Sequence, residues 1–97
     1  MLFAVICTDR PAGLETRMAA RPAHLAYLDS QAAALVEGGA MLDAEGKPCG
    51  SLLLVDVADR AAAVAFAAGD PYAAAGLFES TVIRPFRAVF KDGRKLG

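Results

Sequence analysis

The 97-residue sequence predicts an α+β domain whose elements follow in the order β-α-β-β-α-β. Two patterns support this prediction: short apolar runs bounded by turn-forming residues, and longer stretches in which apolar residues recur every three or four positions. The length allows one core, so residues 1–97 are expected to form a single domain. Much of the 56% hydrophobic content is alanine, which buries little area, so we expect a homodimer in which a second copy adds burial.

The first part of the chain predicts one strand and one helical region. Residues 2–7 form a continuous apolar run closed by Asp9-Arg10-Pro11, which is typical of a buried central strand. Residues 12–36 follow helical spacing, and Gly38-Gly39 is expected to end the helix because glycine readily adopts a left-handed C-terminal cap. Pro22 interrupts this region, so either the helix kinks there or a second helix begins with Pro22 in its first turn.

The middle of the chain predicts a hairpin followed by a second helix. Residues 40–42 and 51–57 are strand-like, and the segment between them is rich in turn formers. Asp59 is well placed to cap a helix over residues 60–68. Gly69-Asp70-Pro71 is expected to end that helix.

The last part predicts a short helical turn and a final strand. The turn covers residues 72–77, and the strand begins at residues 80–84 and continues through Pro85 toward Phe90. Pro85 has no N–H to donate, so it is expected at a sheet edge, at a bulge or where the strand changes its pairing partner. With right-handed crossovers, this element order gives a ferredoxin-like antiparallel sheet of four strands with both helices on one face.

Charge and hydropathy exclude two classes of partner. A formal net charge of −1 leaves no broad basic surface for nucleic acid. No stretch approaches the length of a membrane span, and the apolar N-terminus lacks the basic region of a signal peptide, so we expect a cytoplasmic protein without a membrane partner. The basic residues near the C-terminus are sparse and are expected to form a solvated edge and tail: Arg84, Arg87, Lys91, Arg94 and Lys95.

The cysteines and the single histidine do not form a recognisable metal site. Cys7 and Cys49 are far apart, neither has a second cysteine at ligand spacing, and one histidine cannot complete a zinc site. Both cysteines are expected to be reduced core residues. We expect no metal and no organic cofactor.

His24 is the only histidine, and imidazole is the side chain best suited to proton transfer near neutral pH. A carboxylate bonded to one ring nitrogen would fix the tautomer and direct the other nitrogen at a ligand. Asp70 is the candidate partner, although an Asp between glycine and proline is also ordinary turn chemistry. The alternative is a partly buried structural histidine bonded to a carboxylate.

Three further residues are candidates for binding a substrate. Arg17 and Arg21 share the helix face of His24 if the helix is continuous across Pro22, and there they could hold a carboxylate or phenolate. If the helix breaks, this register is lost, and a solvated or dimer-bridging role remains for both arginines. Tyr72 could supply a pocket hydroxyl or pack over a helix end.

Several motifs together indicate a family. They are the apolar first strand, Leu14-Glu15-Thr16-Arg17, Arg21-Pro22-Ala23-His24-Leu25, Asp70-Pro71-Tyr72 followed by Ala75-Gly76, and Pro85-Phe86. Through these motifs the chain resembles the YciI-like (YCII-related) family over nearly its whole length. The resemblance implies a ferredoxin-like domain that dimerises through its sheets into an α+β barrel, with His24 and Asp70 as the catalytic pair. Residues 43–50 are shorter than the family's hairpin, so a loop that could close the pocket is trimmed.

The leading hypothesis is a small dimeric enzyme in which Asp70 orients His24, and His24 transfers a proton on a small cyclic or anionic organic molecule. Isomerisation, elimination and hydrolytic dehalogenation all fit this chemistry. One alternative is a non-catalytic dimeric module that binds a metabolite or accompanies an enzyme. Another is haem ligation by His24.

Overall fold

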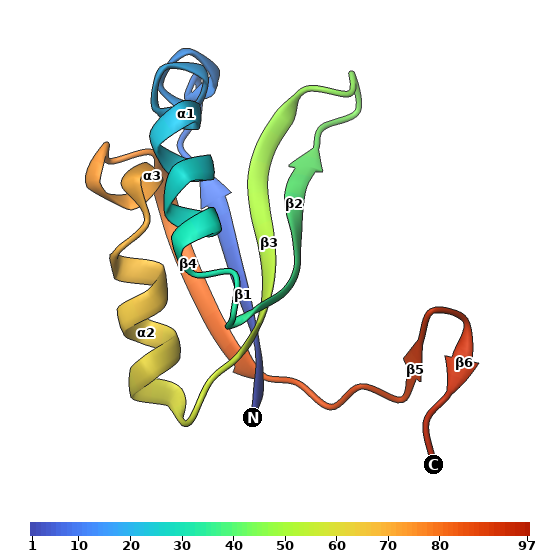
Figure 1. Ribbon diagram of the computed structural model, residues 1–97. Helices are drawn as coiled ribbons and strands as arrows, with labels where there is room; N and C mark the ends of the chain where they lie inside the picture. Colours follow the sequence, from blue (N-terminus) through green and yellow to red (C-terminus); the bar gives the residue numbers. More distant parts are fainter.

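The computed structural model describes residues 1–97 and contains one antiparallel four-stranded sheet with helices on one face (Figure 1). The sheet has the order β2-β3-β1-β4 and consists of β1 (Leu2–Asp9), β2 (Leu35–Leu42), β3 (Pro48–Asp56) and β4 (Phe78–Pro85). The helices are α1 (Leu14–Ser30), α2 (Arg60–Ala68) and α3 (Pro71–Ala74). A separate hairpin at the C-terminus pairs β5 (Phe90–Lys91) with β6 (Arg94–Lys95). The predicted element order and antiparallel sheet are confirmed.

The core lies between the sheet and the helices. Side chains of β1 alternate between two faces, because successive residues of a strand point in opposite directions. One face is fully covered by helices, whereas Leu2, Ala4 and Ile6 on the other, open face are only half-buried. The buried cluster is Phe3, Val5, Cys7, Leu53, Val55, Ala63 and Phe66.

Helix α1 is continuous across Pro22, which decides between the two possibilities for this region. The prediction that the helix extends to residue 36 is wrong, because it ends at Ser30 and the chain enters β2 at Leu35. Gly38 does not cap a helix. It lies in β2, where a Cβ atom would stand 2.6 Å from Cδ2 of Leu53, so a larger residue would force the Leu53 side chain to shift.

The end of the sheet also differs from the prediction. Strand β4 lies at an edge, as expected for a strand that contains Pro85, but it does not continue toward Phe90. The Phe86 N–H donates to the carbonyl of Leu2 at 2.9 Å, and the chain then leaves the sheet (Figure 1). Asp92-Gly93, with φ angles of 51° and 75°, turns it back into the β5-β6 hairpin, which an Asp-Gly pair favours. The basic C-terminal residues are exposed, but they belong to a hairpin rather than a tail.

Helix α2 has the predicted limits, and its first turn is capped by Asp59, which accepts a hydrogen bond from the Ala62 N–H at 2.9 Å. Asp59→Ala is therefore expected to destabilise the fold by about 1 kcal/mol. The measurement is the urea midpoint followed by circular dichroism. Asp59→Asn, which can still cap, should unfold at nearly the wild-type midpoint, and equal midpoints for the two variants would contradict the assignment.

No helix of the structure is both long enough and apolar enough to cross a membrane.

Candidate functional site

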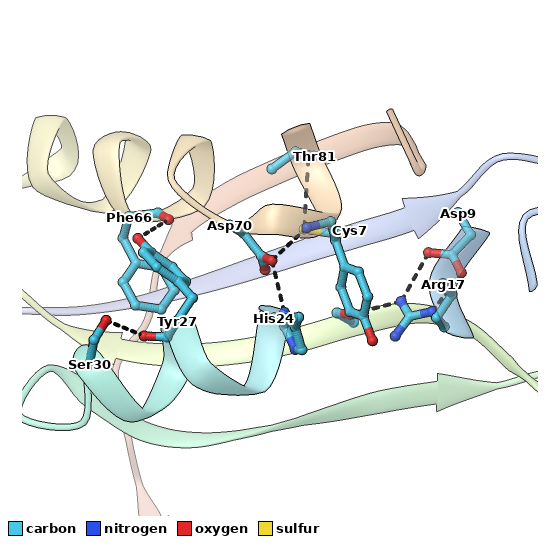
Figure 2. Close-up of polar contacts among 11 residues, drawn as sticks. Cys7, Asp9, Arg17, His24, Tyr27, Ser30, Phe66, Asp70 and Thr81 are labelled. Carbon is cyan, nitrogen blue, oxygen red and sulfur yellow. Dashed lines mark hydrogen bonds and ion pairs between the residues drawn. The ribbon is translucent and has the colours of Figure 1, made fainter. Parts of the chain in front are cut away.

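His24 and Asp70 form a buried pair between α1 and the start of α3 (Figure 2). Nδ1 of His24 lies 2.8 Å from Oδ1 of Asp70, and the two residues are only 7% and 2% exposed. Asp70 is also the N-cap of α3, because the same Oδ1 accepts the N–H of Tyr72 at 2.9 Å. The turn role and the pairing role considered for Asp70 are therefore combined in one carboxylate.

The pair leaves the second nitrogen of His24 available. A carboxylate can only accept a hydrogen bond, so the neutral imidazole bonded to it carries its proton on Nδ1. Nε2 makes no hydrogen bond with the protein, and no buried side-chain nitrogen or oxygen lacks a partner, so Nε2 reaches solvent. This arrangement suits a group that accepts a proton from a ligand.

Tyr72 lies between His24 and Arg17. Its ring stacks on the imidazole with centroids 3.9 Å apart and an interplanar angle of 16°. The guanidinium carbon of Arg17 lies 4.5 Å from the centroid of the same ring. Burial raises the pKa of the Tyr72 hydroxyl, and the positive charges of Arg17 and Arg21 offset part of this rise.

Arg17 is held by side chains of two neighbouring strands, β1 and β3. Its Nε and Nη2 donate to Asp9 at 2.8 and 3.0 Å, and Nη2 also donates to Oγ of Ser51 at 2.9 Å. Burial alone would lower the pKa of Arg17, but the hydrogen bond and negative charge of Asp9 outweigh it and raise the pKa. Arg17 therefore stays charged although only 4% of it is exposed.

The other arginine has a different environment. Because α1 is continuous, Arg21 lies one turn beyond Arg17, and its charge is close enough to affect Tyr72. Arg21 is exposed and makes no hydrogen bond with the protein. It is the free cation nearest to the pair along α1.

Two site residues were missed by sequence reasoning, namely Asp9 and Ser51. Asp9 was assigned to the turn that closes the first strand, yet it lies on the same face of β1 as Cys7 and Val5, two and four residues earlier. That alternation was a usable signal. No sequence signal marks Ser51 as a site residue, because only the pairing of β1 with β3 brings it to Arg17.

A cavity of ≈ 830 Å³ lies on the open face of the sheet, away from this site. It is lined by β1, β2, β3 and the C-terminal segment, and none of its lining residues is His24, Asp70 or Tyr72. No three His, Cys, Asp or Glu side chains cluster in a way that could hold a metal ion.

The two cysteines differ in exposure, so the expectation that both are core residues is wrong for Cys49. Cys7 is buried, and burial raises the pKa of its thiol, offset in part by the hydroxyl of Thr81 at 3.8 Å. Above the ordinary thiol pKa of about 8.5, the unfolded chain releases a proton that the folded chain retains. The contribution of this thiol to stability should therefore be constant near pH 7 and fall as the pH rises past about 8.5 toward 9.5.

The measurement is the urea midpoint across this pH range. Cys7→Ala should show a shallower decline than the wild type, because it removes the thiol whose pKa differs between the two states. Cys49→Ala is the matched control and should keep the wild-type slope. Parallel slopes for the wild type and Cys7→Ala would contradict this account.

The fold agrees with the family that the sequence suggested. The chain belongs to the YCII-related domain family, which it matches over residues 1–87. It is 34% identical over 102 residues to Protein YciI of Escherichia coli O6:H1 (strain CFT073), covering 93% of this chain and 100% of that protein. An uncharacterized protein of Haemophilus influenzae is 33% identical with the same coverage.

A solved structure extends the comparison to a named activity. It is 5-chloro-2-hydroxyhydroquinone dehydrochlorinase (TftG) from Burkholderia phenoliruptrix AC1100, in complex with 2,5-dihydroxybenzoquinone. The TM-score is 0.85 and the sequence identity is 33%, over 90% of this chain and 94% of the other. The chain is thus similar, over nearly its whole length, to an enzyme that acts on a small ring compound.

Proposed function

We propose that this protein is an enzyme in which Nε2 of His24 removes a proton from a ring hydroxyl of a small hydroxylated cyclic compound. The observation that carries the proposal is the buried His24–Asp70 hydrogen bond of 2.8 Å, which leaves Nε2 without a protein partner. The likeness to TftG, whose name gives a chlorinated hydroquinone as substrate, supports this substrate class.

The chemistry needs only the pair and the substrate. Proton removal from a ring hydroxyl by His24, and return of that proton to a ring carbon, converts the hydroxylated ring to its keto form. If that carbon carries chlorine, the C–Cl bond can then break with its electron pair leaving as chloride while a second hydroxyl loses its proton. The net change is loss of one proton and one chloride, with no oxidant required. Without a leaving group, the same proton transfers give an isomerisation.

The charges around the pair suit an anionic ring. Arg21 is exposed and unpaired, and we assign it to the phenolate oxygen of the substrate. Arg17 and Tyr72 are buried beside the His24–Asp70 pair, so they contribute to the shape and charge of the site without contacting solvent. Asp70 acts through His24 by stabilising the imidazolium that forms when the proton is taken.

The experiment uses 5-chloro-2-hydroxyhydroquinone as substrate and chloride release as the measurement. The wild type should release chloride, and His24→Gln should release it only at the uncatalysed rate. Tyr27→Phe, which removes only the hydroxyl that donates to the Phe66 carbonyl, is the folded control and should retain turnover.

A second probe separates catalysis from binding. The wild-type protein could bind 2,5-dihydroxybenzoquinone while every ring substrate is recovered unchanged. That outcome would show that the protein is a metabolite-binding module and not an enzyme. Absence of both binding and turnover across hydroxylated rings would reject the proposed substrate class.

We further propose that the protein is a homodimer formed through the open face of the sheet, as in an α+β barrel. This face exposes apolar side chains, including Leu52 at 45% and Val82 at 39%, and Phe90 on the C-terminal hairpin is 63% exposed. Exposed apolar area of this extent is typical of an interface. A second sheet can pack on such a face at a spacing of about 10 Å.

Sedimentation velocity tests the dimer. Leu52→Asp places a charge in the centre of the open face and is expected to give a monomer. Val64→Asp is the matched control, because Val64 is equally exposed (47%) but lies on α2, on the other side of the sheet. A dimeric Leu52→Asp protein, or a monomeric wild type, would reject this interface.

A further inference from the structure

We propose that Tyr72 is a positioning residue for His24: its ring fixes the plane of the imidazole, and with it the direction in which the lone pair of Nε2 points toward a substrate hydroxyl. The kinetic consequence of this proposal rests on the proposed function. Its structural part, the control of the ring orientation, is independent of any reaction.

Tyr72 is fixed from several directions and is only 1% exposed. Its backbone N–H donates to Asp70, and its ring meets Phe78 edge-on with centroids 6.0 Å apart at 79°. One face of the ring contacts His24 at 3.9 Å between centroids, and Arg17 lies over the ring at 4.5 Å from its centroid. A side chain with so many contacts provides a rigid surface for its neighbour.

The hydrogen bond to Asp70 and the covalent link to α1 leave some tilt of the His24 ring unrestrained. The Cβ–Cγ bond and the Nδ1 hydrogen bond hold two neighbouring positions on one side of the imidazole, and the ring can still rock about the line that joins them. A nearly parallel aromatic ring, at 16° to the imidazole, opposes this rotation because tilting would open a gap on one side and a clash on the other. Two contacts of different kinds are thus needed to define one orientation.

The stack also determines how a ligand approaches. The lone pair of Nε2 lies in the plane of the imidazole and points outward from its edge. Tyr72 covers one face of that ring, so a substrate ring cannot stack there. A hydroxyl that comes in along the edge meets the lone pair directly, which is the geometry required for proton transfer.

Arg17 supports the other side of this arrangement. Its guanidinium is held by Asp9 at 2.8 and 3.0 Å and by Ser51 at 2.9 Å, so it is anchored to β1 and β3. The order of layers is the sheet-anchored Arg17, then Tyr72, then His24 on α1. The orientation of the imidazole relative to the sheet is therefore set through the Tyr72 ring.

The test compares Tyr72→Phe with Tyr72→Leu by NMR, where the single histidine gives unambiguous ring signals. Phe keeps the stack, so its His24 signals should match the wild type. Leu removes it, so the carbon-bound ring protons of His24 should lose the shielding of the aromatic face and move downfield. With 5-chloro-2-hydroxyhydroquinone, kcat should fall on the order of 10- to 100-fold in the Leu variant, with KM little changed, and recover in the Phe variant.

The matched control is Tyr27→Leu, which removes the other tyrosine and its tilted contact with Phe66 at 5.7 Å. It should leave the His24 ring signals close to those of the wild type. If Tyr72→Leu does not fold, Tyr72→Met, whose flexible side chain fills irregular space, makes the same comparison.

Unchanged His24 ring signals in a folded Leu or Met variant would overturn the proposal. If no ring compound is turned over by the wild type, the NMR comparison still decides whether Tyr72 positions His24, so the two proposals fail separately.

Discussion

Asp70→Asn is expected to fold like the wild type and to lose kcat about 10²- to 10³-fold on a hydroxylated ring substrate. The amide oxygen of Asn can occupy the place of Oδ1, which accepts both His24 and the Tyr72 N–H, and Asn is itself a good helix cap. What disappears is the negative charge beside the imidazolium. An ion pair at about 4 Å with an effective dielectric constant of about 20 contributes about 4 kcal/mol, which corresponds to about 10³ in rate.

The measurement is steady-state chloride release, accompanied by an NMR spectrum of the His24 ring to confirm that its orientation has not changed. Asp59→Asn is the matched control, because it makes the same substitution at the cap of α2, at the opposite end of that helix from Asp70. An Asp70→Asn protein with wild-type kcat would remove the charge of Asp70 from the mechanism.

Arg17→Met is expected to lower the free energy of unfolding by about 3–5 kcal/mol, because it leaves the carboxylate of Asp9 buried without its cation. Ser51 also loses a hydrogen-bond donor. Folded domains of ordinary stability have only about 5–15 kcal/mol in total, so the variant is expected to unfold at a much lower urea concentration.

Two comparisons make this result specific to the buried pair. Arg60→Met removes an exposed arginine that donates to the carbonyl of Ile83 at 2.8 Å, and it should cost no more than about 1 kcal/mol. Adding Asp9→Asn to Arg17→Met should recover part of the loss, because no buried charge remains. Equal urea midpoints for Arg17→Met and Arg60→Met would show that the pair does not stabilise the fold.

Local signals in the sequence were sufficient where an element is defined by its own residues. Helix α2 begins after its cap and ends at Ala68 as expected, because Asp59 and the Gly69-Asp70-Pro71 segment act on the adjacent turns. The first part of strand β2, before residue 40, is not predicted, for the opposite reason. Leu35 continues the spacing of α1, and only pairing with β3 makes this segment a strand.

The same distinction applies to the site. The pairing of His24 with Asp70 could be suggested from their residue types and from the family resemblance, and the structure places them 2.8 Å apart. The contact of Arg17 with Ser51 could not be suggested in this way. It depends on the register that sets Ser51 opposite Cys7, and the register of two strands far apart in sequence cannot be read from either one.

The carboxylate oxygen that His24 and Tyr72 share links the imidazole to a backbone amide. When the imidazole gains a proton or meets a ligand, its hydrogen bond to that oxygen strengthens, and the competing bond from the Tyr72 amide weakens. The amide resonance and hydrogen-exchange rate of Tyr72 should therefore respond to events at a side chain on another helix. The chain thus carries a built-in reporter of site occupancy that needs no label at the site itself.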